Sequence, residues 1–206
     1  MKNDSVRKLA MNGLMIALVF LATYFTRIPT LLPGGYFNLG DAVIMMAAAF
    51  LGPIGGLTAG SMGSAFADLA AGAFIYAPVT LVVKGIEGLA VGLLAAKYMK
   101  SDKFKQAGAI RTPGKNITGS LLTDKGTKNT AANLKLILAL VVGAVIIVAG
   151  YFSGEAFVLS LFDSAFGIVA AAGELVANTV QGVLSAFLAY FLILVLSKVG
   201  IQKYMS

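Results

Sequence analysis

The sequence predicts an all-α integral membrane protein with six transmembrane helices and both termini in the cytoplasm. The first observation is composition: 58% of the 206 residues are hydrophobic and 12% are charged, whereas soluble domains are about 45–50% apolar and about 25% charged. The second is a series of long apolar runs, which raises the mean hydropathy to +0.88. The third is the placement of the basic residues, which lie in only some of the segments between these runs.

The composition also excludes several classes of function. The chain has no cysteine and no histidine, so it offers no disulfide, thiolate nucleophile, Cys/His zinc site or histidine-based triad. We predict no catalytic residue, no metal and no cofactor. A formal charge of +7 would suggest nucleic acid in a soluble protein, but these charges lie between apolar runs. We therefore expect membrane lipids, and no nucleic acid, around the chain.

A transmembrane helix needs about 20 mostly apolar residues. In chain order the predicted spans are Leu9–Phe25, Leu39–Leu51, Ile54–Ala71, Val79–Ala96, Leu134–Phe152 and Gly173–Leu196.

The first two predicted spans are unusual, one for its basic flank and the other for its short length. Two basic residues precede Leu9–Phe25, as in a signal peptide, but no small-residue cleavage site follows, so we expect the helix to be retained. Leu39–Leu51 has only 13 residues before Gly52-Pro53. We count it because Ile54–Ala71 follows directly and the chain must return to the other side.

The last spans complete the topology. The apolar run Ala165–Leu196 is too long for one upright helix, so we place its beginning in an outer loop. Six spans put both termini on one side. Of the 16 basic residues, three precede the first span, nine lie in 97–135 and two follow the last span. The positive-inside rule makes that side cytoplasmic.

Segment 97–135, between helices four and five, is polar and rich in Lys, Gly, Thr and Asn, without apolar periodicity. It predicts a flexible basic cytoplasmic loop within a single membrane domain, 1–206.

Two ionisable residues lie inside the fourth span. Lys84 and Glu87 are three residues apart and therefore share one helical face. Because a charged group at the centre of a span costs at least about 2.5–3.5 kcal/mol, such residues are functional candidates by default. They either form a structural ion pair or line a substrate cavity, and we favour the cavity.

The sixth span carries a polar stripe. Glu174, Asn178, Gln181 and Ser185 are spaced to form one continuous line along a helix. In lipid these groups would lack hydrogen-bond partners, so the stripe faces protein or a cavity. Hydrogen bonding between helices is the alternative to ligand contact.

Further candidates lie near the predicted outer face. Asp41 follows Asn38 by three residues, a variant of the capping box, and we favour a capping role for Asp41 over a binding role. Asp68, at the outer end of the third span, belongs either to a site or to its rim. Tyr36 lies in a loop rich in Pro and Gly and either stacks on a flat ligand or anchors the loop at the membrane interface.

Small residues recur at four-residue spacing and allow helices to approach closely. Most of these pairs predict packing within the chain. Gly13 and Ala17 differ because they belong to the first helix, which can lie at the edge of the bundle and offer its groove to another protein.

Three motifs carry a resemblance to a known family. They are Asn38-Leu39-Gly40-Asp41, Val83-Lys84-Gly85-Ile86-Glu87-Gly88 and Asn178-Thr179-Val180-Gln181-Gly182. With the six spans, the first outer loop and the Gly13/Ala17 pair, the chain resembles over nearly its whole length the S components of energy-coupling factor (ECF) vitamin transporters. It is most similar to the branch for pyridoxine-type vitamins and hydroxymethylpyrimidine. The family's first-helix pattern is Ala-xxx-Ala, from which Gly13 departs.

The resemblance implies a high-affinity substrate-binding subunit in a bacterial cell membrane that takes up a water-soluble vitamin, with pyridoxine, pyridoxal or hydroxymethylpyrimidine favoured. Such a subunit is no enzyme, and docks, here through Gly13 and Ala17, on a coupling transmembrane protein and two ATPases. The vitamin lies near the outer face. The resemblance places Lys84, Glu87, Glu174 and Asn178 in that region. Together with the candidates from the residues themselves, the predicted binding residues are Tyr36, Asn38, Asp41, Asp68, Lys84, Glu87, Glu174, Asn178 and Gln181.

Two other classes remain open. A self-sufficient secondary transporter or channel for a small polar solute would move substrate without an ATPase. A membrane-embedded enzyme is disfavoured by the lack of His and Cys.

Overall fold

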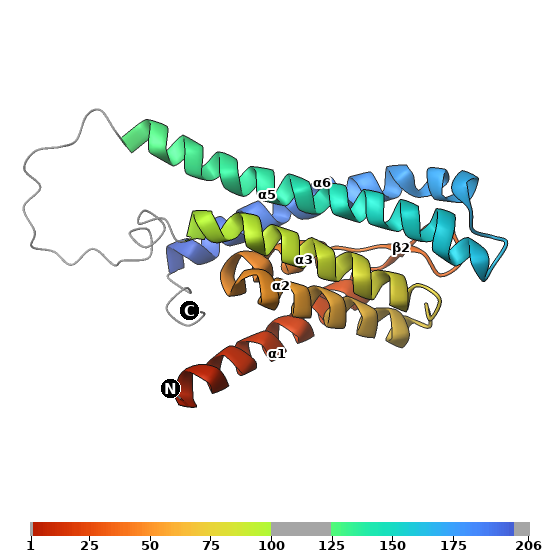
Figure 1. The fold of residues 1–206 in the computed structure, drawn as a ribbon, viewed down its shortest axis with the longest axis horizontal. Coiled ribbons are helices and arrows are strands. Elements are labelled where there is room, and N and C mark those ends of the chain that lie inside the picture. The colour runs from red at the N-terminus through yellow and green to blue at the C-terminus, as the bar shows by residue number, and fades with distance from the viewer. Residues whose placement is uncertain (1, 100–124, 200–206) are drawn as a thin grey trace, which may run out of the picture.

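The computed structural model describes residues 2–99 and 125–199, which form a bundle of long helices (Figure 1). The helices are α1 (Lys2–Phe25), α2 (Gly40–Ala71), α3 (Ala77–Met99), α5 (Lys125–Ser153) and α6 (Ile168–Val199). A π-helical turn, Gly154–Val158, and a 3-10 turn, Leu159–Leu161, follow α5.

Among the described residues, five helices are long and apolar enough to cross a membrane, and they are the five named above. A nearly all-helical membrane protein is therefore confirmed. The prediction of a purely α-helical chain missed one feature, a pair of two-residue antiparallel strands. Strand β1 (Ile28–Pro29) pairs with β2 (Tyr36–Phe37) in the first loop. Strands this short have no periodicity from which a sequence predicts them.

Helix α2 consists of two arms that meet at Gly52. This residue has φ 79° and ψ −170°, and Pro53 follows it. A Cβ atom built on Gly56 lies 2.6 Å from Ala48 Cβ, and one built on Gly60 lies 3.1 Å from Ile44 Cγ2. In one straight helix, at about 1.5 Å per residue, Ile44 and Gly60 would be about 24 Å apart. The two arms therefore fold back on each other, and their boundary lies where the Gly-Pro pair predicted it.

The bundle hides polar groups and exposes apolar ones, the reverse of a soluble protein. The charged side chains of Asp41, Lys84 and Glu87 are at most 1% exposed, whereas Leu, Val and Phe residues cover the outside of α1, α5 and α6. Between the second arm of α2 and α3 the backbones touch, because a Cβ on Gly56 would collide with the carbonyl oxygen of Gly88. Small residues thus provide the packing surfaces that helices in lipid use.

The two ends of the bundle differ. The beginning of α1, the end of α3, the beginning of α5 and the end of α6 lie at one end (Figure 1). At the other end a small apolar cluster joins Leu32 of the first loop to Tyr76 before α3 and to Phe166 before α6. Helix α1 packs on α2 at one edge of the bundle.

The boundaries differ from the predicted ones at two helices. Helix α5 begins at Lys125 instead of Leu134, and α6 begins at Ile168 instead of Gly173. The predicted loop 97–135 therefore overlaps the ends of two helices, and its central part, 100–124, lies outside the described residues.

Candidate functional site

A polar cavity lies below the β1–β2 hairpin, between helices α2, α3, α5 and α6. Its volume is about 30 Å³, enough for one or two water molecules. A heteroaromatic ring enters only if lining side chains or the hairpin move. Six residues predicted as binding residues line it: Tyr36, Asn38, Asp68, Glu174, Asn178 and Gln181. Six others also line it: Thr30, Gly35, Tyr76, Thr80, Tyr151 and Glu155.

The polar stripe of α6 holds the first loop over the cavity. Glu174 Oε1 accepts hydrogen bonds from the backbone N–H groups of Leu31 at 2.8 Å and Leu32 at 2.9 Å. One helical turn further along the stripe lies Asn178, and Gln181 Oε1 then accepts from the Asn38 N–H at 2.8 Å. The stripe therefore faces protein and cavity, and it contributes hydrogen bonds between segments as well as cavity lining.

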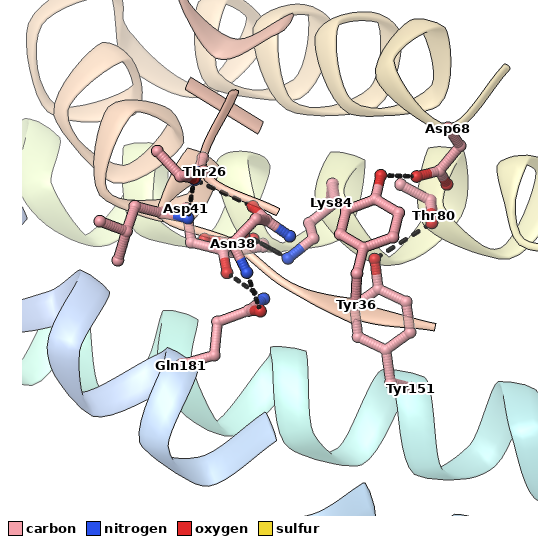
Figure 2. Close-up of polar contacts among 12 residues, drawn as sticks. Thr26, Tyr36, Asn38, Asp41, Asp68, Thr80, Lys84, Tyr151 and Gln181 are labelled. Atoms are coloured by element: carbon pink, nitrogen blue, oxygen red, sulfur yellow. Dashed lines mark hydrogen bonds and ion pairs between the residues drawn. The ribbon is translucent and has the colours of Figure 1, made fainter. Parts of the chain in front are cut away.

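Asp41 begins a second, fully buried polar cluster (Figure 2). Its carboxylate forms an ion pair with Lys84 Nζ and accepts a hydrogen bond from Gln181 Nε2 at 2.7 Å. The ammonium group of Lys84 also lies 5.0 Å from the ring centroid of Tyr151, and Glu87 Oε2 lies 4.0 Å from Lys84 Nζ.

The buried cluster changes two interpretations of the sequence. The capping role favoured for Asp41 is wrong, because its carboxylate binds Lys84 and Gln181, whereas the N–H of Gly40 at the start of α2 donates to Asn38 Oδ1 at 2.9 Å. The nearest partner of Lys84 is Asp41, 43 residues away, and not Glu87 on its own helix. Asp41, Lys84 and Glu87 are not among the residues that line the cavity. Lys84 and Asp41 touch lining residues, Tyr151 and Gln181.

Two tyrosine–carboxylate pairs face the cavity. Tyr36 donates its hydroxyl hydrogen to Asp68 Oδ1 (Figure 2), and Tyr76 donates to Glu155 Oε1 at 3.2 Å. Burial, followed by the charge of the adjacent carboxylate, raises the pKa of Tyr36 and of Tyr76 well above the ordinary value. Both hydroxyls therefore stay protonated and act as donors.

Each pair leaves one carboxylate oxygen free. Several side-chain atoms of the described residues are buried without a hydrogen-bond partner, and three of them belong to residues that line the cavity: Asp68 Oδ2, Glu155 Oε2 and the amide nitrogen Asn178 Nδ2. Asp68 and Glu155 are 2% and 3% exposed. Because buried polar groups are nearly always paired, three orphaned atoms around one cavity make this cavity the candidate binding site.

Some of the missed lining residues had a signal in the sequence. Glu155 is an acid at the end of an apolar run, and the same position made Asp68 a candidate binding residue. Tyr151 precedes Glu155 by one helical turn. Thr80 shares the helical face of Lys84. Thr30 and Gly35 had no such signal, because only the hairpin brings them to the cavity.

The predicted docking pair lies elsewhere. Gly13 and Ala17 are both exposed on α1, and a Cβ built on Gly13 meets no atom within 4 Å. Neither position is therefore covered by packing within the described residues.

Comparison with known proteins adds a family and two relatives. The model of the family described as the ECF-type riboflavin transporter, S component, matches residues 3–198. An uncharacterized protein of Pyrococcus woesei is 33% identical over 135 residues, which cover 66% of this chain and 69% of that protein. The UPF0397 protein YdcD of Lactococcus lactis is 34% identical over 107 residues, 52% of this chain and 56% of that protein. This match therefore spans little more than half of YdcD.

A solved structure, described as that of the S component of a bacterial ECF transporter, has a similar fold. It aligns with 93% of this chain and 94% of its own length, with a TM-score of 0.53 and 15% sequence identity. At that identity the likeness shows the fold alone.

Proposed function

The chain belongs to the ECF-type riboflavin transporter S component family, and on that premise we propose that it is the membrane subunit that captures a heteroaromatic vitamin for an ATP-driven ECF module. The observation that carries the proposal is the cavity below the β1–β2 hairpin, with its three orphaned polar atoms. Its walls also present the rings of Tyr36, Tyr76 and Tyr151. Aromatic faces and a few convergent polar groups are what small-molecule sites generally provide.

The vitamin we favour is small, of the pyridoxine, pyridoxal or hydroxymethylpyrimidine kind. The family description names riboflavin, a three-ring compound. A cavity of about 30 Å³ must open for any of these ligands, and a single ring requires less movement than three. Three motifs of the sequence support the same branch.

The partners we propose are one coupling transmembrane protein and two ATPase subunits. The exposed Gly13/Ala17 groove on α1, at the edge of the bundle, is the proposed docking surface. A shallow groove of small residues suits close packing by a helix of another membrane protein. ATP hydrolysis then belongs to the partners.

We also propose that the two arms of α2 are separate spans. Each arm faces the other across Gly52, so six crossings result and both ends of the chain lie on the same side. The basic residues make that side the cytoplasm. Cysteine labelling tests this arrangement: a cysteine at Thr30 should react with an impermeant reagent from outside, and one at Ser101 only after the membrane is opened. External labelling at Ser101 contradicts it.

The function itself is tested by identifying the ligand. Native mass spectrometry of the purified full chain should find a co-purified heteroaromatic compound, and calorimetry with pyridoxine, hydroxymethylpyrimidine and riboflavin should rank the three. Uptake into vesicles should then require ATP and the partner subunits. Binding of none of these compounds refutes the proposal, and uptake without any ATPase makes the chain a self-sufficient transporter instead.

A further inference from the structure

We propose that the cavity selects the neutral or protonated form of a heteroaromatic compound that offers two hydrogen-bond donors, and rejects anionic forms of the same ring. The inference rests on the proposed function and adds the charge and hydrogen-bonding class of the ligand. Phosphorylated and carboxylated vitamins are thereby excluded as substrates.

The orphaned oxygen atoms determine which donors a ligand needs. Asp68 Oδ2 and Glu155 Oε2 are buried acceptors without a donor among the described residues. Their sister oxygens already receive the hydroxyls of Tyr36 and Tyr76, so each carboxylate has one oxygen left for a ligand. A complementary ligand therefore carries two N–H or O–H groups on different parts of its ring.

The third orphan completes the pattern. Asn178 Nδ2 is a buried donor without an acceptor among the described residues, and Asn178 also lines the cavity. The ligand should thus carry one acceptor beside its two donors. A hydroxymethyl-substituted pyridine or an aminopyrimidine has this combination, whereas a phosphate or carboxylate group presents acceptors only.

The charge of the cavity wall also selects the ligand. The cavity wall contains three carboxylic side chains and, within the described residues, no lysine or arginine. The nearest basic groups lie behind the wall: Lys84 is paired with Asp41, and the guanidinium carbon of Arg27 lies 4.1 Å from the ring centroid of Tyr24 and 5.6 Å from that of Tyr36.

The surrounding charges are predominantly negative. Five of the nine acidic residues of the chain lie in or beside the cavity, against two basic ones, an excess of three negative formal charges if all are ionised. The acids are Asp41, Asp68, Glu87, Glu155 and Glu174. An anionic ligand would meet like charges at low dielectric, while a protonated amine or pyridinium would be attracted.

Calorimetry on the full chain in detergent tests this inference with ligands of one size and different charge. The probes are pyridoxamine, pyridoxine and 4-pyridoxate, which share one ring and differ at a single substituent. We expect pyridoxamine to bind at least as tightly as pyridoxine, and 4-pyridoxate to bind about 10- to 100-fold more weakly, the loss typical of a hydrogen bond to a charged group. Riboflavin and its 5′-phosphate provide a second matched pair.

Variants connect the selectivity to the two carboxylates. Asp68→Asn and Glu155→Gln keep the side-chain shape and remove the charge. Each should therefore weaken pyridoxine binding about tenfold and reduce the difference in affinity between pyridoxine and 4-pyridoxate. Asp163→Asn is the matched control, because Asp163 is an exposed acid of the α5–α6 connection that does not line the cavity. It should change neither affinity nor selectivity.

The outcomes separate the two proposals. If none of the neutral vitamins binds, the proposed function fails, and this inference fails with it. If pyridoxine or riboflavin binds and its anionic counterpart binds equally well, only this inference is overturned. The comparison of ligands uses the unaltered chain, so a variant that does not fold cannot obscure the result.

Discussion

Lys84 on α3 and Asp41 at the start of α2 form an ion pair in which the two side chains are 1% and 0% exposed. Gln181 of α6 donates a hydrogen bond to the same carboxylate, so this pair ties three helices together. A charge in the interior of a membrane protein is tolerated only with such partners. The pair therefore belongs to the structural support of the cavity.

We predict that breaking the ion pair destabilises the protein. Asp41→Asn leaves Lys84 without its closest carboxylate, and Lys84→Met leaves the carboxylates of Asp41 and Glu87 buried without a cation. Each change should cost about 3–5 kcal/mol, because one buried charge stays uncompensated. The double variant should lose less stability than the sum of the two single losses. Melting temperatures in detergent measure all three variants. Additive losses would show that the two residues are not coupled.

A second prediction concerns ligand contact by Asn178. Its amide nitrogen is an orphaned donor at the cavity, so Asn178→Leu should weaken vitamin binding about tenfold without a comparable fall in stability. Thr179→Val is the control, because Thr179 is the exposed neighbour on α6. Calorimetry measures both, and wild-type affinity in a folded Asn178→Leu variant would remove Asn178 from the site.

The hydrogen bonds of the first loop lead to a third prediction. Glu174→Ala should speed hydrogen exchange at the amides of Leu31 and Leu32, which lose their acceptor, and leave the amide of Asn38 protected. Gln181→Leu should do the reverse. Loss of hydrogen bonds to a charged acceptor should accelerate exchange about 10- to 100-fold. Equal acceleration at all three amides in both variants would mean that the loop opens as one unit.

The fold-back of α2 gives a fourth prediction. Gly52 has φ 79° and ψ −170°, a region that only glycine readily adopts, so Gly52→Asn should cost about 1–3 kcal/mol. Gly72 provides the comparison, since its φ of 78° and ψ of 7° lie in the left-handed region that asparagine tolerates. A Cβ on either glycine meets no atom within 4 Å, so crowding does not distinguish them. Thermal unfolding should show a clearly larger loss for Gly52→Asn.

The fifth prediction separates binding from transport. Gly13→Leu and Ala17→Leu add bulk at two exposed positions of α1 that do not line the cavity. They should leave melting temperature and vitamin affinity unchanged yet abolish ATP-driven uptake with the partner subunits, because a helix cannot approach a bulky surface closely. Ala149→Leu, at an exposed alanine on α5, should keep full uptake. Normal uptake by both α1 variants would rule out this docking surface.

The sequence by itself determined the elements that depend on local composition. Apolar runs predict helices in a membrane whatever they pack against. Gly52-Pro53 marks the turn of α2 because glycine readily adopts a positive φ and proline lacks the N–H that would continue the helix. The polar stripe of α6 was also predictable, since a helix aligns residues at its own period. From this stripe, the outer loop and Asp68 at the end of the third predicted span, the sequence identified half of the residues that line the cavity.

Only the tertiary structure decided which polar groups meet. Lys84 has Glu87 one turn away on its own helix, yet it pairs with Asp41, because the fold-back of α2 brings that carboxylate closer. Tyr76 and Glu155 are 79 residues apart and meet across the cavity. Local periodicity carries no information on contacts between distant segments. Such contacts depend on how the helices pack, and this packing separated the buried ion pair from the carboxylates left free for a ligand.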